Sequence, residues 1–143
     1  MELKQLSVFV ENKKGRLSEI SKVLADNNID IRAVSIADTT DYGILRIIVN
    51  KPDEAMVALK SNGITVSLTT VIAIAIDDRP GGLYSAVKIL SDNDISVEYM
   101  YAFLNPTNNA ACVILRVEDN QKASDVLKNG GFKLLTVDEV TNL

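Results

Sequence analysis

The sequence repeats itself, and this internal duplication constrains the fold more than any other feature of the chain. A shift of 66 residues superimposes Gly15 on Gly81 and Leu24 on Leu90. Two copies are too few for a solenoid, which needs at least three repeats. The alternative is chance similarity between two amphipathic patterns, but glycines and a loop match as well as apolar positions. We therefore expect two small modules, residues 1–69 and 70–143.

The best shift changes along the chain. It becomes 70 where residues 45–47 (Leu-Arg-Ile) match residues 115–117 (Leu-Arg-Val), and it returns to 68 where Gly63 matches Gly131. We place these changes in turns. The Asn/Pro-rich stretch 105–109 is typical of a loop, so we predict a longer hairpin in the second copy.

The hydrophobic periodicity alternates between two and 3.6 within each copy, which separates strands from helices. The first copy predicts a strand at 6–10, a helix from 17 to 27, hairpin strands at 29–37 and 43–49, a helix from 52 to 62 and a strand at 65–68. The second copy predicts the same order, with strands at 71–76, 97–104, 111–117 and 132–137 and helices starting near 83 and 123. This order is that of an α+β protein with two tandem ferredoxin-like βαββαβ modules and antiparallel sheets. Because about one residue separates the copies, we expect them to pack as one rigid block.

The composition excludes several classes of function. The chain has 15 Lys+Arg against 19 Asp+Glu, no histidine and one cysteine. Histidine is the commonest general base and metal ligand, so we expect no metal, no cofactor and no histidine-based catalysis. The net charge of -4 argues against nucleic acid, whose binding depends on Lys and Arg.

No targeting segment is visible at the N-terminus, and the longest uncharged stretch, 61–76, is interrupted by polar residues. A membrane-spanning helix needs about 20 predominantly apolar residues. We therefore expect a soluble cytoplasmic protein without a membrane span. Cys112 lies in an apolar run, where a free cysteine behaves as a small buried hydrophobe.

Two strand-to-helix turns, residues 11–17 and 77–83, are the strongest candidates for a binding site. Each follows a strand with polar residues, supplies a glycine and then starts a helix. The first N–H groups of a helix have no intrahelical partner, so they can bind a carboxylate. Asn12 or Asp78 would meet an ammonium group or a side chain. The alternative is that Asn12 and Asp78 only cap the helices, as Asn and Asp commonly do.

These segments resemble the ACT domain, a small ligand-binding module of amino-acid metabolism. The resemblance rests on Glu-Asn-x-x-Gly-x-Leu at 11–17, Asp-x-Arg-Pro-Gly-x-Leu in the second copy, and the starts of the following strands, Asn-Asn-Ile-Asp-Ile and Asn-Asp-Ile-Ser-Val. It covers almost the whole chain twice. The first copy carries Lys14 where proline is usual in the family.

The resemblance implies that an amino acid binds between two modules, at the turn of one and the start of the second strand of the other. The implied turn residues are Asn12, Gly15, Arg16, Leu17, Asp78, Pro80, Gly81, Gly82 and Leu83. The implied facing edge is formed by Asp30, Ile31, Ser96 and Val97.

The family also implies a role. The chain resembles stand-alone ACT proteins, so we expect a regulatory homodimer that binds an amino acid or related carboxylate and controls a separate enzyme or other protein. Two alternatives stay open. One is a ligand-free module for protein interaction or dimerisation, and the other is a small phosphatase using Arg16 or Arg79, although no paired nucleophile and base is visible.

Tyr99, Tyr101 and Phe103 alternate along one predicted strand, so their rings share one face. Packing against the helices of the module and an interface between modules or chains are both plausible interpretations. Single-stranded RNA also stacks on aromatic residues of such sheets. The acidic charge of the second copy argues against RNA, because such surfaces normally carry positive charge.

Overall fold

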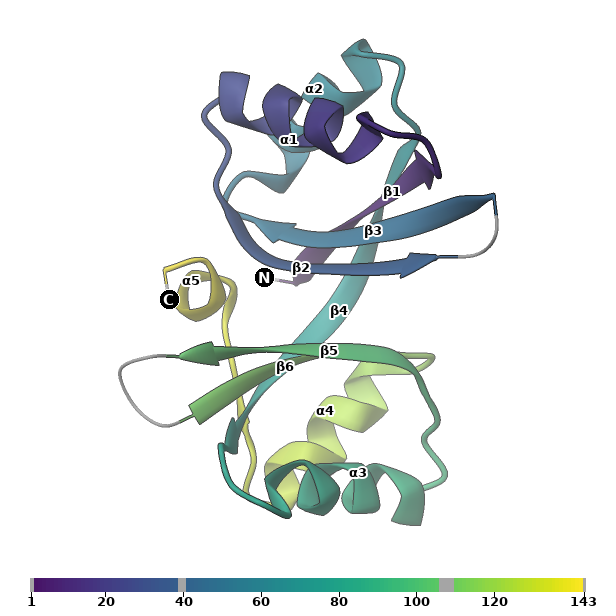
Figure 1. The fold of residues 1–143 in the computed structure, drawn as a ribbon. Coiled ribbons are helices and arrows are strands. Elements are labelled where there is room, and N and C mark those ends of the chain that lie inside the picture. The colour runs from purple at the N-terminus through teal and green to yellow at the C-terminus, as the bar shows by residue number, and fades with distance from the viewer. Residues whose placement is uncertain (1, 39–40, 106–109, 143) are drawn as a thin grey trace. The chain divides into compact units, whose positions relative to one another are not determined.

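A computed structural model describes residues 2–38, 41–105 and 110–142 and confirms the α+β class (Figure 1). The contacts divide the chain into a first unit, Lys4–Thr69, and a second unit, Met1–Leu3 with Thr70–Leu143. Each unit is a ferredoxin-like βαββαβ module with an antiparallel sheet. The predicted turn at 38–41 and loop at 105–109 fall partly outside the described residues, at 39–40 and 106–109.

The first unit contains six elements, of which the first and the last extend into the second unit. These are β1 (Leu3–Glu11), α1 (Arg16–Asp26), β2 (Ile31–Asp38), β3 (Tyr42–Val49), α2 (Pro52–Ser61) and the first part of β4 (Val66–Asp77). The strand order is β2-β3-β1-β4. Leu6, Val8 and Val10 alternate along β1 on the face that packs against Ile20 and Leu24 of α1, so the period-two and period-3.6 patterns meet in one core.

The second unit continues from β4 in the same order. Its other elements are α3 (Gly82–Asp92), β5 (Val97–Asn105), β6 (Ala110–Val117), α4 (Asn120–Asn129), β7 (Lys133–Leu134) and α5 (Val137–Thr141). The strand order is β5-β6-β4, and β7 pairs with the other side of β4. Ile74, Val113 and Leu115 form the core with Leu90 of α3 and Leu127 of α4.

The end of the second unit differs from the prediction. The strand expected at 132–137 is limited to Lys133–Leu134, followed by one more backbone bond from Leu135 N to Ala73 O at 2.8 Å. The chain then starts α5, because Thr136 accepts a bond from Glu139 N and the Glu139 carboxylate accepts one from Thr136 N. This reciprocal pair is a capping box, whose Thr-x-x-Glu signature is present in the sequence.

Strand register corrects one part of the repeat alignment. Leu6 of β1 pairs with Ile47 of β3, and the equivalent Ile72 of β4 pairs with Leu115 of β6. Residue 47 therefore corresponds to residue 115, a shift of 68, and the shift of 70 is wrong for these strands. Shifts of 68 and 70 differ by two residues, so both keep the same side chains on the same face, and alternation cannot distinguish them.

The aromatic residues of β5 lie on the face away from α3 and α4. Met100 pairs with Leu115 on the core face, whereas Tyr101 pairs with Ile114 and alternates with Met100. The interpretation that Tyr99, Tyr101 and Phe103 pack against the helices is therefore wrong. All three side chains are partly buried.

Cys112 lies on β6 and is 2% exposed, which confirms its predicted burial. Burial disfavours the charged thiolate and raises the pKa of Cys112 to about 12. The cysteine is therefore an inert part of the sheet at neutral pH.

Candidate functional site

The first turn connects β1 to α1 through a left-handed glycine. Gly15 has φ 90° and is the N-cap residue of α1, a conformation that strains residues with a Cβ atom. The first helical backbone bond runs from Glu19 N to Gly15 O at 3.0 Å. The N–H groups of Leu17 and Ser18 precede that bond, so they have no intrahelical acceptor.

The second turn repeats this backbone arrangement 66 residues later. Gly81 has φ 87° and is the N-cap residue of α3, and Ser85 N bonds to Gly81 O at 3.1 Å. The N–H groups of Leu83 and Tyr84 are the corresponding groups without an intrahelical acceptor. Ser18 and Tyr84 were missed from the sequence, because the positions of free N–H groups depend on which residue is the N-cap.

The identity of the N-cap residues corrects one interpretation. Both N-caps are glycines, so Asn12 and Asp78 are not N-cap residues. Asn12 follows the end of β1, and its backbone N bonds to Asp41 O at 3.0 Å. Asp78 is exposed, and its carboxylate has no hydrogen bond or ion pair within the described part of the chain.

The turns differ at the residue after the glycine. Gly82 is buried, and a Cβ atom there would clash with the Asp77 carbonyl oxygen. The equivalent residue in the first turn is Arg16, which carries a long side chain. The second turn is therefore the tighter of the two. Pro80 precedes Gly81 and is exposed, and Leu17 and Leu83 are 48% and 42% exposed in the first turns of their helices.

Charges in the first turn form an exposed network. The Arg16 guanidinium binds Glu19 at 2.9 Å and lies 3.6 Å from Glu11, which also pairs with Lys13 at 2.9 Å. The Lys13 hydrogen bond, helped by the charges of Lys13 and Arg16, lowers the pKa of Glu11. Glu19 raises the pKa of Arg16. Such exposed pairs stabilise the fold little but hold the guanidinium beside the turn.

A small pocket of about 140 Å³ lies beside the first turn. Arg16 and Glu19 of α1 line it, together with Phe9 of β1 and residues 63–65 after α2. The bond from Phe9 N to Thr65 O at 2.9 Å holds the two segments together. Of the residues predicted for the site, only Arg16 lines this pocket. Residues 63–65 are distant from the turn in sequence, so only the fold identifies them as part of this pocket.

The facing edge of the first unit starts β2. Asp30 N donates to Asn50 Oδ1 at 2.9 Å, and the Asp30 carboxylate pairs with Arg32 at 2.8 Å. Ile31 pairs with Val49 and is 38% exposed. The 11-residue α1 separates this edge from the Gly15 turn by about 16 Å, at 1.5 Å per residue. The turn and the edge of one unit therefore do not meet.

In the second unit, α3 separates the Gly81 turn from the start of β5 in the same way. Ser96 is exposed and lines a cleft of about 600 Å³ with Asp94, Glu98, Glu118 and the start of α4. Val97 is partly buried and packs against the core. The Asp119 carboxylate caps α4 by accepting a bond from Lys122 N at 3.0 Å. This edge is acidic, whereas the first-unit edge carries a paired Arg32.

In the part of the chain that the structure describes, no group of three or more His, Cys, Asp or Glu side chains is arranged to hold a metal ion. No helix in residues 2–38, 41–105 and 110–142 is long and apolar enough to cross a membrane.

Comparison with known proteins identifies the family. No curated protein sequence gives a significant match. The protein BT0572 from Bacteroides thetaiotaomicron is 43% identical, with a TM-score of 0.94 over 100% of this chain and 98% of that one. The ligand-free regulatory subunit of aspartate kinase from Thermus thermophilus is 14% identical, with a TM-score of 0.67 over 91% of this chain and 93% of that one, so it shares the fold. The ACT domain pair family matches residues 1–143, and the chain belongs to this family.

Proposed function

We propose that this protein is a regulatory module that binds an amino acid or a related small carboxylate at its glycine turns. The observation that carries the proposal is the pair of helices whose N-caps are left-handed glycines. A glycine has no side chain to occupy the free N–H groups, so a ligand carboxylate can reach them. Asp78, whose carboxylate has no partner among the described residues, is the candidate for the ligand ammonium at the second turn.

The proposed site needs two modules. The turn residues Gly15 and Gly81 would supply the N–H groups, and the starts of β2 and β5 would supply the facing edge. Since α1 and α3 separate turn from edge within a unit, the edge would come from another module. We propose modules with boundaries at 1–69 and 70–143 and a homodimer, which would supply four modules in symmetric pairs.

The proposed biological role follows from the family and not from a catalytic group. This ACT domain pair would act on a separate cytoplasmic protein, and ligand binding would change that interaction. The aspartate kinase regulatory subunit shares the fold of this chain, which supports a regulatory role and leaves the ligand to be identified by experiment.

A thermal-unfolding screen tests the proposal. The purified protein is screened against the twenty amino acids and common 2-oxo acids, with light scattering for the oligomeric state. A ligand at 100 times its Kd adds about 2.7 kcal/mol to the free energy of unfolding. Failure of every compound to shift the transition of a well-folded protein would overturn the proposal.

Variants then locate the site. Gly81→Ala and Gly15→Ala each place a methyl group in the open space beside a turn, where no atom lies within 4 Å. Gly131→Ala is the matched control, because Gly131 has φ 88° and equally open surroundings outside the turns. The ligand-induced shift is expected to fall in a turn variant and to persist in the control.

The second candidate is an interaction module that binds no small ligand. The aromatic side chains of β5 favour it, because they lie on the sheet face opposite α3 and α4. Aromatic residues are enriched at protein interfaces. Tyr101→Asp is expected to dissociate an assembly that uses this face, and an unchanged mass in light scattering would exclude that assembly.

A further inference from the structure

The strand directions show how a glycine turn of one module can meet the edge of another. In the first unit, β1 and β2 are both antiparallel to β3, so they run in the same direction. The Gly15 turn therefore lies near the end of β2, where Asn12 N bonds to Asp41 O at 3.0 Å. β2 and β5 are the two ends of the strand order. An antiparallel strand placed beside β2 starts where β2 ends, so its start would lie next to the Gly15 turn.

The starts of β2 and β5 have the same backbone. Asn28 and Asp94 occupy equivalent positions at the shift of 66, and their φ angles are 56° and 57°. The strand pairing then shifts at the same place, between residues 31 and 33 of β2 and between residues 97 and 99 of β5. Either edge could therefore face a turn, and the side chains decide between them.

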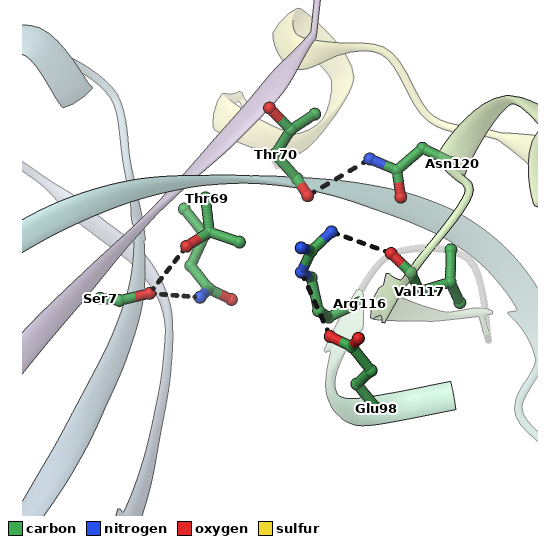
Figure 2. A network of polar contacts seen from close by, with 8 residues as sticks. Ser7, Thr69, Thr70, Glu98, Arg116, Val117 and Asn120 are labelled. Atoms are coloured by element: carbon green, nitrogen blue, oxygen red, sulfur yellow. Dashed lines mark hydrogen bonds and ion pairs between the residues drawn. The ribbon is translucent and has the colours of Figure 1, made fainter. Parts of the chain in front are cut away.

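The charges of the two edges differ. The cleft of about 600 Å³ at the start of β5 is lined by four carboxylate residues and one cation, namely Asp94, Glu98, Glu118, Asp119 and Lys122. Glu98 lies 3.4 Å from Arg116, as Figure 2 shows. The carboxylates of Asp94 and Glu118 are exposed and have no hydrogen bond or ion pair among the described residues. Their equivalents in the first unit are the neutral residues Asn28 and Asn50.

The two turns carry unpaired charges of opposite sign. In the first turn the Lys14 ammonium group is exposed and has no hydrogen bond or ion pair within the described part of the chain, whereas the other charged side chains pair with one another. In the second turn Arg79 pairs with Asp77 at 3.2 Å, which leaves the Asp78 carboxylate unpaired. The first turn therefore presents a cation and the second an anion.

These charges favour one combination of modules. Two second units facing each other would bring Asp78 against Asp94 and Glu118, and like charges placed together oppose association. Two first units would bring Lys14 against neutral asparagines, with no charge attraction. A first unit facing a second unit places Lys14 beside two unpaired carboxylates, so this combination is complementary.

The edge strand β2 also presents apolar surface. Val34 and Ile36 are 61% and 50% exposed, and they alternate on one face of the strand. An exposed edge strand with apolar side chains is a template for pairing with another strand. Docking along β2 would cover these side chains and its unpaired backbone groups.

We propose that each binding site is completed by the unlike unit of a second copy of this chain. The first unit of one chain docks with β2 antiparallel to β5 of its partner, and Lys14 lies against the partner's Asp94 and the partner's Glu118. The inference rests on the proposed function, because it names the residues that face each turn. A two-fold axis makes the same contact twice. The dimer then holds two kinds of site, in which the Gly15 turn faces an acidic edge and the Gly81 turn faces the edge with Lys51.

Cross-linking of variants with one added cysteine tests which units face each other. Cys112 is 2% exposed and its thiol has a pKa of about 12, so it does not compete for the reagent. Full-length Lys13→Cys and Ser96→Cys chains are mixed, left to exchange subunits and treated with a short bismaleimide, and a covalent dimer is expected. Lys13→Cys mixed with Asp30→Cys is the matched control, because Asp30 is the equivalent of Ser96, and no covalent dimer is expected.

The cross-linking result separates this proposal from the proposed function. Absence of the Lys13→Cys to Ser96→Cys product, or an equal or larger yield in the control, would overturn the pairing of unlike units. A ligand-induced shift in the thermal screen would still support the proposed function in that case. The expected cross-link without any ligand shift would do the reverse, so the two proposals fail separately.

Charge reversal tests the contact of Lys14. Light scattering over a range of concentrations measures the dimer Kd. Lys14→Glu and Glu118→Lys are each expected to raise it about tenfold, and the two changes together are expected to restore it. Lys60→Glu with Glu118→Lys is the control, because Lys60 is an exposed lysine at the end of α2, and no restoration is expected. A monomeric parent chain, unchanged Kd values, or equal restoration by Lys60→Glu would overturn the proposal.

Discussion

The two glycine turns have the same backbone and different chemistry. Gly15 and Gly81 have nearly the same φ, and each is followed by the same pattern of backbone hydrogen bonds. The first turn then presents Arg16, held by Glu11 and Glu19, whereas the second has Gly82 against the Asp77 carbonyl group. A repeat can therefore preserve the geometry that exposes N–H groups while the charge beside them changes. The two turns are expected to prefer different ligands even if both bind a carboxylate.

The largest effects are expected in the two cores, where the units are most alike. Leu24 of α1 and Leu90 of α3 are equivalent by the shift of 66, and each is 1% exposed. Leu24→Ala and Leu90→Ala are each expected to lower the free energy of unfolding by about 3 kcal/mol, because each leaves a cavity. Urea denaturation measures both values.

The controls for these variants are Leu17→Ala and Leu83→Ala, at exposed positions of the same helices. We expect each to cost less than about 1 kcal/mol, because surface substitutions have small effects. If Leu24→Ala lowers the free energy of unfolding several times more than Leu90→Ala does, the two cores do not contribute equally to stability. That result would contradict the equivalence of the two units.

A smaller effect is expected at the position where the turns differ. Gly82→Ala forces a methyl group against the Asp77 carbonyl oxygen, so we expect it to cost about 2 kcal/mol, as overpacking does. Arg16→Ala keeps the Cβ atom that the first turn already accommodates, and we expect little change. Urea denaturation of the two variants, side by side, measures the difference. Equal stability of Gly82→Ala and the parent protein would mean that the second turn is no tighter than the first.

The sequence was sufficient to predict the order of elements up to β7, because each helix and strand buries one face against a neighbour, but α5 was not predicted. Val8 and Leu24 illustrate this, since the alternation of β1 and the helical spacing of α1 both lead into one core. The sequence could not determine the register of β3 and β6. Moving a strand by two residues leaves the same side chains inside, so only the pairing of Leu6 with Ile47 and Ile72 with Leu115 distinguishes the alternatives.

The candidate site was only partly predictable. The glycines of the turns were identified because a sharp change from strand to helix needs a left-handed residue. The pocket beside Arg16 was not, because residues 63–65 reach it through the fold. The face of Tyr101 stayed undecided between two alternatives, because alternation shows that three rings share a face and does not show which face meets the helices.

The smallest expected effect concerns α5, which only the second unit has. Lys133 binds the Glu139 carboxylate at 2.7 Å, and this bond, with the Thr136 backbone N–H, lowers the pKa of Glu139. A depressed folded-state pKa means that the stabilisation is present at neutral pH, above the unfolded value of about 4.5, and is lost as the pH falls through the folded value. Acid should therefore loosen the capping box as the Glu139 carboxylate becomes protonated.

An NMR titration of the Glu139 carboxyl group checks this expectation. Its pKa is expected below the ordinary glutamate value, and Lys133→Met is expected to raise it because the main cause of the shift is removed. Lys128→Met is the matched control, since Lys128 is an exposed lysine of α4 outside this ion pair. An ordinary Glu139 pKa, or equal effects of the two variants, would contradict the assignment. Faster amide exchange of residues 137–141 at low pH should accompany the protonation of Glu139, because its carboxylate is part of the capping box of α5.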